Sequence, residues 1–207
     1  ELEKTSVIDR EQLEVWKKQL ATLDIPTTYT HIVSKENPTP ANWAYFAVVS
    51  EQARCQLCGM DATAFIEHQL PSQLLRLDQN GMYHDGNITG PFQPIVYDMV
   101  SRNLIGLSRF MGYEGKYADE IDKMMENSDE LTLRMQSVTG ELAYGGRSNQ
   151  CLHNEVMLAN YCELRAALLN KKGDKEKADY YKSMMENLKR ALNGAGWDGR
   201  WFKRAYT

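Results

Sequence analysis

The residues best suited to chemistry lie in three glycine-containing segments, GMYHDG at 81–86, AYGGRSN at 143–149 and GWDGRW at 196–201. Together they hold aromatic rings, carboxylates, an amide, guanidinium groups and an imidazole. Aromatic rings present flat apolar faces that suit pyranose rings, and the polar groups can hydrogen-bond hydroxyls or carboxylates. The candidate residues are Tyr83, His84, Asp85, Tyr144, Arg147, Asn149, Trp197, Asp198, Arg200 and Trp201. The alternative interpretation is that these are ordinary turns, with Gly and Asn present for their backbone geometry.

His153 is a further candidate because it lies one helical turn after Asn149. Residues four apart share a helix face, so both side chains can point towards the loop that precedes them. A buried histidine with its hydrogen bonds satisfied in the core is the alternative.

Two catalytic chemistries fit this set of residues. A glycoside hydrolase needs two carboxyl groups, about 5 Å apart for retention or about 6.5–9.5 Å apart for inversion. Asp85 is the first candidate, and Glu141, Glu155 or Asp198 could be the second. A polysaccharide lyase would instead use Tyr144 or His153 for proton transfer. A third possibility is a helical scaffold that binds a sugar without catalysis.

The elements that carry these residues are expected to be helices. After an N-terminal helix, three pairs follow in which the first helix is apolar on most sides and the second is amphipathic. A helix that is apolar on most sides is buried on most sides, so the first member of each pair should be the inner one. The N-terminal helix is expected at about 9–22. The first pair consists of 40–58 and a helix from 62 that is interrupted near Pro71. The second pair is 94–111 with 116–135, and the third is 149–169 with a helix that starts after Asp174.

The apolar helices begin at intervals of about 55 residues, which indicates a repeated helical hairpin. The fold class is therefore all-α: three antiparallel hairpins plus an N-terminal helix, in a single domain over 1–207. The connections within hairpins are short and those between hairpins are long. In an antiparallel stack all the long connections lie at one end, here called the loop end, beside the N-termini of the inner helices. This topology predicts that the candidate residues share one cleft.

Composition excludes several classes of partner. The chain is 43% hydrophobic and 25% charged with a net charge of −4, so neither nucleic acid nor a membrane is expected as a partner. Cys55 and Cys58 lie one turn apart on an expected helix, where a disulfide would be strained. No metal site and no cofactor is predicted. The sequence makes no prediction of oligomeric state.

Several motifs carry a resemblance to a known superfamily. They are NWAYFAVVSEQARCQLCGM at 42–60, GMYHDG, YDMVSRNL at 97–104 and GELAYGGRSNQCLHNE at 140–155. This pattern resembles uncharacterised bacterial members of the six-hairpin α/α-toroid superfamily of glycosidases and polysaccharide lyases. The segment GAGWDGRWFKRAY at 194–206 is similar to one in cellobiose-phosphorylase-type enzymes.

The resemblance implies a partial (α/α) toroid and a carbohydrate substrate, with a periplasmic or extracellular location. It implies an active site where the long connections meet, in the neighbourhood of Asp85, Tyr144, Arg147, Asn149 and His153. Six hairpins of about 55 residues would need more than about 300 residues, so three hairpins are expected to be half a toroid or a piece of a longer protein. Of the candidate residues, we expect Asp85, His153 and Tyr144 to be catalytic and the following to bind substrate: Tyr83, His84, Arg147, Asn149, Trp197, Asp198 and Trp201.

Overall fold

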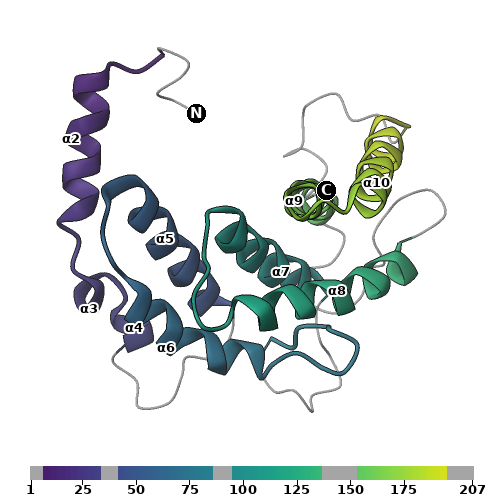
Figure 1. The fold of residues 1–207 in the computed structure, drawn as a ribbon, viewed down its shortest axis with the longest axis horizontal. Helices are drawn as coiled ribbons and strands as arrows, with labels where there is room; N and C mark the ends of the chain where they lie inside the picture. Colours follow the sequence, from purple (N-terminus) through teal and green to yellow (C-terminus); the bar gives the residue numbers. More distant parts are fainter. Residues whose placement is uncertain (1–6, 34–41, 86–94, 137–152, 195–207) are drawn as a thin grey trace, which may run out of the picture.

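The computed structural model describes residues 7–33, 42–85, 95–136 and 153–194 (Figure 1). Within these ranges the chain is helical, with no strand and one isolated antiparallel bridge between Leu77 and Tyr83. The expected all-α class is confirmed. The helices are α2 (Arg10–Ala21), α3 (Ile25–Thr28), α4 (Thr30–Val33), α5 (Trp43–Cys58), α6 (Thr63–Leu74), α7 (Ile95–Phe110), α8 (Ala118–Met135), α9 (His153–Lys172) and α10 (Lys175–Gly194).

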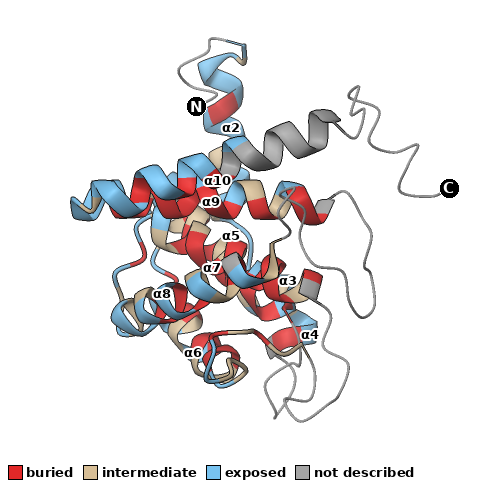
Figure 2. Cartoon of the chain, turned by 90° about the vertical axis from the view of Figure 1, so that its right-hand side faces the viewer, coloured by how far each residue is buried: buried red, intermediate tan, exposed pale blue. Residues whose placement is uncertain are grey.

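The long helices form the three expected hairpins, α5–α6, α7–α8 and α9–α10. Helix α7 packs between α5 and α9, and α2 packs against α5. Figure 1 views α9 almost along its axis while α5 and α7 run across the picture, so the third hairpin crosses the first two. Figure 2 shows α9 and α10 lengthwise. The loop end is the end at which α5 and α7 begin and α6 and α8 finish.

The expected inner and outer layers are confirmed in the second and third hairpins. Most of α7 and α9 is buried, whereas α8 and the described side chains of α10 bury one stripe each and are partly or fully exposed elsewhere (Figure 2). The prediction is wrong for the first hairpin, because α5 exposes Trp43, Phe46 and Leu57. Helices α2, α6 and α7 pack against α5 but leave part of its apolar surface open.

Helix ends follow the sequence signals where those signals are local. Gly59 and Gly112 follow α5 and α7 with positive φ, as expected. Two expectations are wrong. Helix α6 continues through Pro71 to Leu74, because Pro71 removes only one donor and the Pro71 carbonyl still accepts from Leu75. Helix α5 begins at Trp43 rather than near residue 40, with Asn42 at the N-cap.

A buried network of charges joins the second and third hairpins. The Asp98 carboxylate pairs with Arg102 within α7, and both side chains are fully buried. The Arg102 guanidinium lies over the ring of Tyr161 from α9, 5.2 Å from its centroid. The Tyr161 hydroxyl donates to Asp129 of α8 at 3.0 Å, and Arg165 of α9 binds the same carboxylate at 2.7 Å.

Cys55 and Cys58 are free thiols, as expected. Cys58 donates to the backbone carbonyl of Lys17 in α2 at 3.4 Å, and the Cys55 sulfur accepts from the backbone of Ala62 at 3.3 Å. These contacts attach α2 and the start of α6 to α5. None of the described helices is both long and apolar enough to span a membrane.

Candidate functional site at the loop end

A tight reversal after α6 forms one wall of the candidate site. It is organised by Asp78, whose Oδ1 accepts from the backbone of Asn80 at 2.8 Å and of Met82 at 3.0 Å. The backbone N–H of Asp78 donates to the Met82 carbonyl at 3.0 Å. An aspartate that bonds its own backbone two residues ahead fixes a turn without help from a sheet. The positions of Gln79 and Asn80 are therefore set by the chain itself.

The second oxygen of Asp78 lies 3.0 Å from Nε2 of His84. Partial burial acts to raise the pKa of the Asp78 carboxyl, but the hydrogen bonds from His84, Met82 and Asn80 outweigh it and hold the pKa below its ordinary value. Asp78 is thus ionised at neutral pH. His84 is part of the anchor of this turn, and its Nε2 is already engaged with Asp78.

The turn docks directly on α8 at Gly81. The Ser128 hydroxyl donates to the Gly81 carbonyl at 2.7 Å. Gly81 has φ of +79°, and a Cβ built there would lie 2.7 Å from Oγ and 2.9 Å from the backbone N of Ser128. Only glycine meets both conditions without strain. This contact holds the turn against the last two turns of α8.

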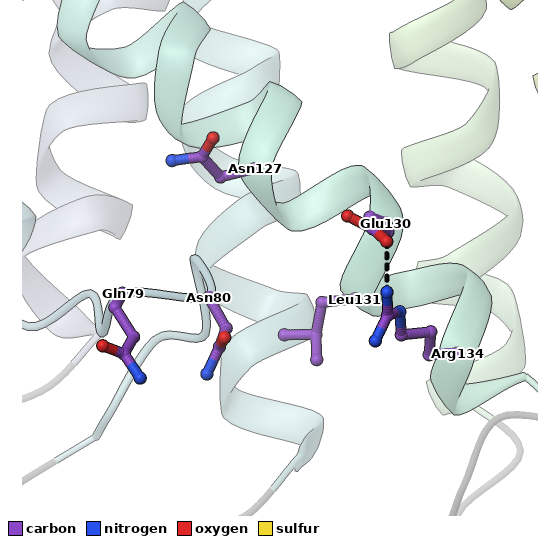
Figure 3. Close-up of a pocket in the computed structure, with 6 residues that line it drawn as sticks. All are labelled: Gln79, Asn80, Asn127, Glu130, Leu131 and Arg134. Atoms are coloured by element: carbon purple, nitrogen blue, oxygen red, sulfur yellow. Dashed lines mark hydrogen bonds and ion pairs between the residues drawn. The ribbon is translucent and has the colours of Figure 1, made fainter.

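The turn and α8 enclose a polar cleft of about 280 Å³ (Figure 3). Figure 3 shows Asn80 across from Leu131, with Asn127 on the preceding turn of α8 and the ion pair of Glu130 with Arg134 beyond them. Three amides from two elements thus face a space with one carboxylate, one guanidinium and one apolar side chain. This loop-end cleft is lined by Gln79, Asn80, Asn127, Glu130, Leu131 and Arg134.

The side chain of Asp85, which follows α6 in the chain, contacts the backbone at the N-terminus of α5. Its Oδ1 accepts from the backbone N–H of Asn42 at 3.1 Å, and the Asn42 side chain makes no capping bond. A carboxylate at a helix N-terminus is stabilised by the helix dipole. The next residue, Trp43, is 58% exposed. The structure therefore places a carboxylate and an exposed aromatic residue together at the loop end.

Tyr83 is placed differently from the expectation. It is 1% exposed, its hydroxyl donates to Gln73 Oε1 at 2.8 Å, and its ring lies 5.6 Å from that of Tyr45. Its backbone N–H donates to Asp98 at 2.7 Å. Burial raises the pKa of the Tyr83 hydroxyl. The ring fills the core between α5, α6 and α7. The prediction that Tyr83 contacts a ligand is therefore wrong.

The remaining expected residues divide into two groups. His153 is the first residue of α9. Outside the described residues lie Tyr144, Arg147, Asn149, Trp197, Asp198 and Trp201, together with Glu141 and Arg200. A cleft shared by these residues and Asp85 thus stays a prediction.

The lining of the loop-end cleft was missed by sequence reasoning. Asn127, Glu130 and Arg134 lie on the polar face of an amphipathic helix, which usually is a solvated surface. Gln79 and Asn80 precede the glycine of a turn, a position that is typical of loops in general. Trp43 lies in the helix expected at 40–58, which was predicted to be an inner helix. No local sequence pattern distinguishes these side chains from ordinary surface residues. They form a cleft only because the turn docks on α8.

Within the described ranges no group of three or more His, Cys, Asp and Glu side chains is placed to hold a metal ion. No family model, curated protein or solved structure matches this chain.

Proposed function

We propose that this chain binds a carbohydrate in the loop-end cleft. The observation that carries the proposal is the set of amides from Gln79, Asn80 and Asn127, which come from two elements and line one cleft. An amide both donates and accepts, as does a sugar hydroxyl, so a few amides can bind a pair of neighbouring hydroxyls. Leu131 offers an apolar contact for the C–H face of a sugar ring.

The rigidity of the turn supports the same function. Asp78 fixes the backbone of Asn80, and the contact of Gly81 with Ser128 fixes the turn on α8. A site whose side chains are held before the ligand arrives loses less conformational entropy on binding. Weak individual hydrogen bonds to hydroxyls then suffice for measurable affinity.

For the reaction, we propose glycoside hydrolysis with Asp85 as one of the two carboxylates. The Asp85 carboxylate accepts from the backbone N–H of Asn42 at the loop end, and the next residue, Trp43, is exposed and offers an aromatic face for a sugar ring. The second carboxylate is proposed to be Glu141 or Asp198. Glu155 is nearly fully buried near the start of α9, which makes it a weaker candidate. The resemblance to six-hairpin toroid enzymes supports this chemistry and the arrangement of the hairpins as part of a ring.

We expect Asn127→Ala to weaken oligosaccharide binding about tenfold, because it removes a hydrogen bond worth about 1–1.5 kcal/mol. Titration calorimetry with a panel of hexasaccharides, both uncharged and uronate-containing, measures the affinity. Asn170→Ala is the matched control, since Asn170 is also an exposed asparagine but lies at the C-terminal end of α9. Equal affinities for the two variants would contradict a site in the cleft, and failure of every hexasaccharide to bind would contradict the function.

We expect Asp85→Asn to lower hydrolytic turnover by about 10²–10⁴-fold, the usual contribution of an acid–base group. The amide oxygen of Asn can still accept from the Asn42 N–H, so the melting temperature should stay within a few degrees of the wild type. Release of reducing ends from the hexasaccharide that binds best provides the assay. A variant that is folded and fully active would show that Asp85 only caps α5.

A further inference from the structure

We infer that the loop-end cleft selects uncharged saccharides and that Glu130 is the residue that excludes anionic ones. The inference rests on the proposed carbohydrate binding and adds the class of substrate. It follows from the charges in the cleft and from the position of the cleft on α8.

The charges that line the cleft cancel. Arg134 is the one cation among the described lining residues, and its guanidinium is paired with the Glu130 carboxylate. The other lining side chains are amides and a leucine. A uronate carboxylate bound to Arg134 would therefore lie close to the Glu130 carboxylate, and the two negative charges would repel each other. A hydroxyl can accept from Arg134 or donate to Glu130 without breaking the pair.

The backbone adds to the same preference. The α8 residues that line the cleft, from Asn127 to Arg134, occupy the last turns of a helix that ends at Met135. The C-terminal end of a helix carries a partial negative charge from its unpaired carbonyls, which repels anions. In the turn that forms the opposite wall, the ionised Asp78 carboxylate accepts a hydrogen bond from the backbone of Asn80. No helix N-terminus among the cleft residues compensates for these charges.

This selectivity separates the two enzymatic alternatives. Elimination by a lyase requires a uronate, whose carboxylate stabilises the charge that develops on the neighbouring carbon. Hydrolysis has no such requirement. If the cleft disfavours carboxylates as proposed, the reaction is hydrolysis of a neutral glycan rather than elimination.

The test compares two sets of hexasaccharides on the wild type and on Glu130→Gln. One set consists of uncharged gluco-, xylo-, manno- and galacto-oligomers, and the other of oligomers of galacturonate, mannuronate and guluronate. We expect the wild type to bind at least one uncharged hexamer tenfold or more tightly than any uronate oligomer. A unit charge at about 4 Å in water is worth about 1 kcal/mol, so Glu130→Gln should improve uronate binding about fivefold and change neutral binding little.

Salt and a control variant complete the design. In 1 M NaCl the gain from Glu130→Gln should fall, because the Debye length is then about 3 Å. Glu163→Gln, which removes an exposed carboxylate on α9 away from the cleft, should leave the ratio of neutral to uronate affinity unchanged. A wild type that prefers uronates, or an unchanged ratio in Glu130→Gln, overturns the selectivity and leaves carbohydrate binding intact. If no member of either set binds, the proposed function itself fails.

Discussion

Replacing Arg102 with methionine is expected to lower the free energy of unfolding by about 3–5 kcal/mol, the usual cost of leaving one member of a buried ion pair without its partner. Asp98 and Arg102 are both fully buried, so the Asp98 carboxylate would lose its counter-charge where water cannot replace it. The substitution also removes the donor to the Ser128 carbonyl, 3.0 Å away, and to the Thr132 hydroxyl. Urea denaturation followed by circular dichroism measures the change.

Two further variants show whether the cost comes from the uncompensated charge. Lys182→Met breaks an exposed ion pair with Asp179 and should change stability by less than about 1 kcal/mol. The double variant Asp98→Asn with Arg102→Met removes both charges, and Asn can still accept from the Tyr83 N–H. This double variant should recover more than half of the free energy of unfolding that Arg102→Met alone loses. A double variant no more stable than Arg102→Met alone would mean that lost packing, rather than lost charge balance, is responsible.

Gly81→Ala is expected to destabilise the protein by about 2–5 kcal/mol. Positive φ costs a non-glycine residue roughly 1–2 kcal/mol, and forcing an extra methyl into a filled contact costs about 1–3 kcal/mol more. The new Cβ would lie 2.7 Å from Ser128 Oγ and 2.9 Å from its backbone N, which cannot move without disturbing α8. The same shift would displace Gln79 and Asn80, so oligosaccharide binding should be lost in whatever fraction remains folded.

Gly173→Ala is the control for the backbone contribution. Gly173 has φ of +86°, similar to that of Gly81, but a Cβ there would meet nothing within 4 Å. It should cost only the roughly 1–2 kcal/mol of the backbone conformation. Equal losses for the two variants, measured by urea denaturation, would show that the turn is not tightly docked on α8.

The number and order of the helices could be predicted because they depend on local patterns. The apolar breadth of the helix at 95–110 and the single stripe of its partner gave the correct inner and outer assignment. The same reasoning failed for α5. Periodicity shows which faces are apolar, but it does not show whether a neighbour covers each of them. Trp43 and Phe46 belong to the face that nothing covers within the described residues.

The candidate site could be predicted only in outline. The residues of the loop GMYHDG take different roles in the structure: Tyr83 enters the core, His84 anchors the turn through Asp78, and Asp85 caps α5. Each role depends on a partner that is distant along the chain or hidden within the turn. The start of α5 shows the same limit, since the carboxylate that caps it belongs to Asp85, which is 43 residues away along the chain.

The most direct test of carbohydrate binding is to map where it occurs. In ¹⁵N-resolved NMR spectra, a mixture of uncharged hexasaccharides should shift the side-chain amides of Gln79, Asn80 and Asn127 and the backbone amides of the last turns of α8. The shifts should saturate with one affinity, and Asn127→Ala should need about tenfold more saccharide to reach the same shifts. A site elsewhere would contradict the account, for example shifts confined to the apolar groove at Trp16 and Leu20 on α2, as would spectra unchanged at millimolar saccharide.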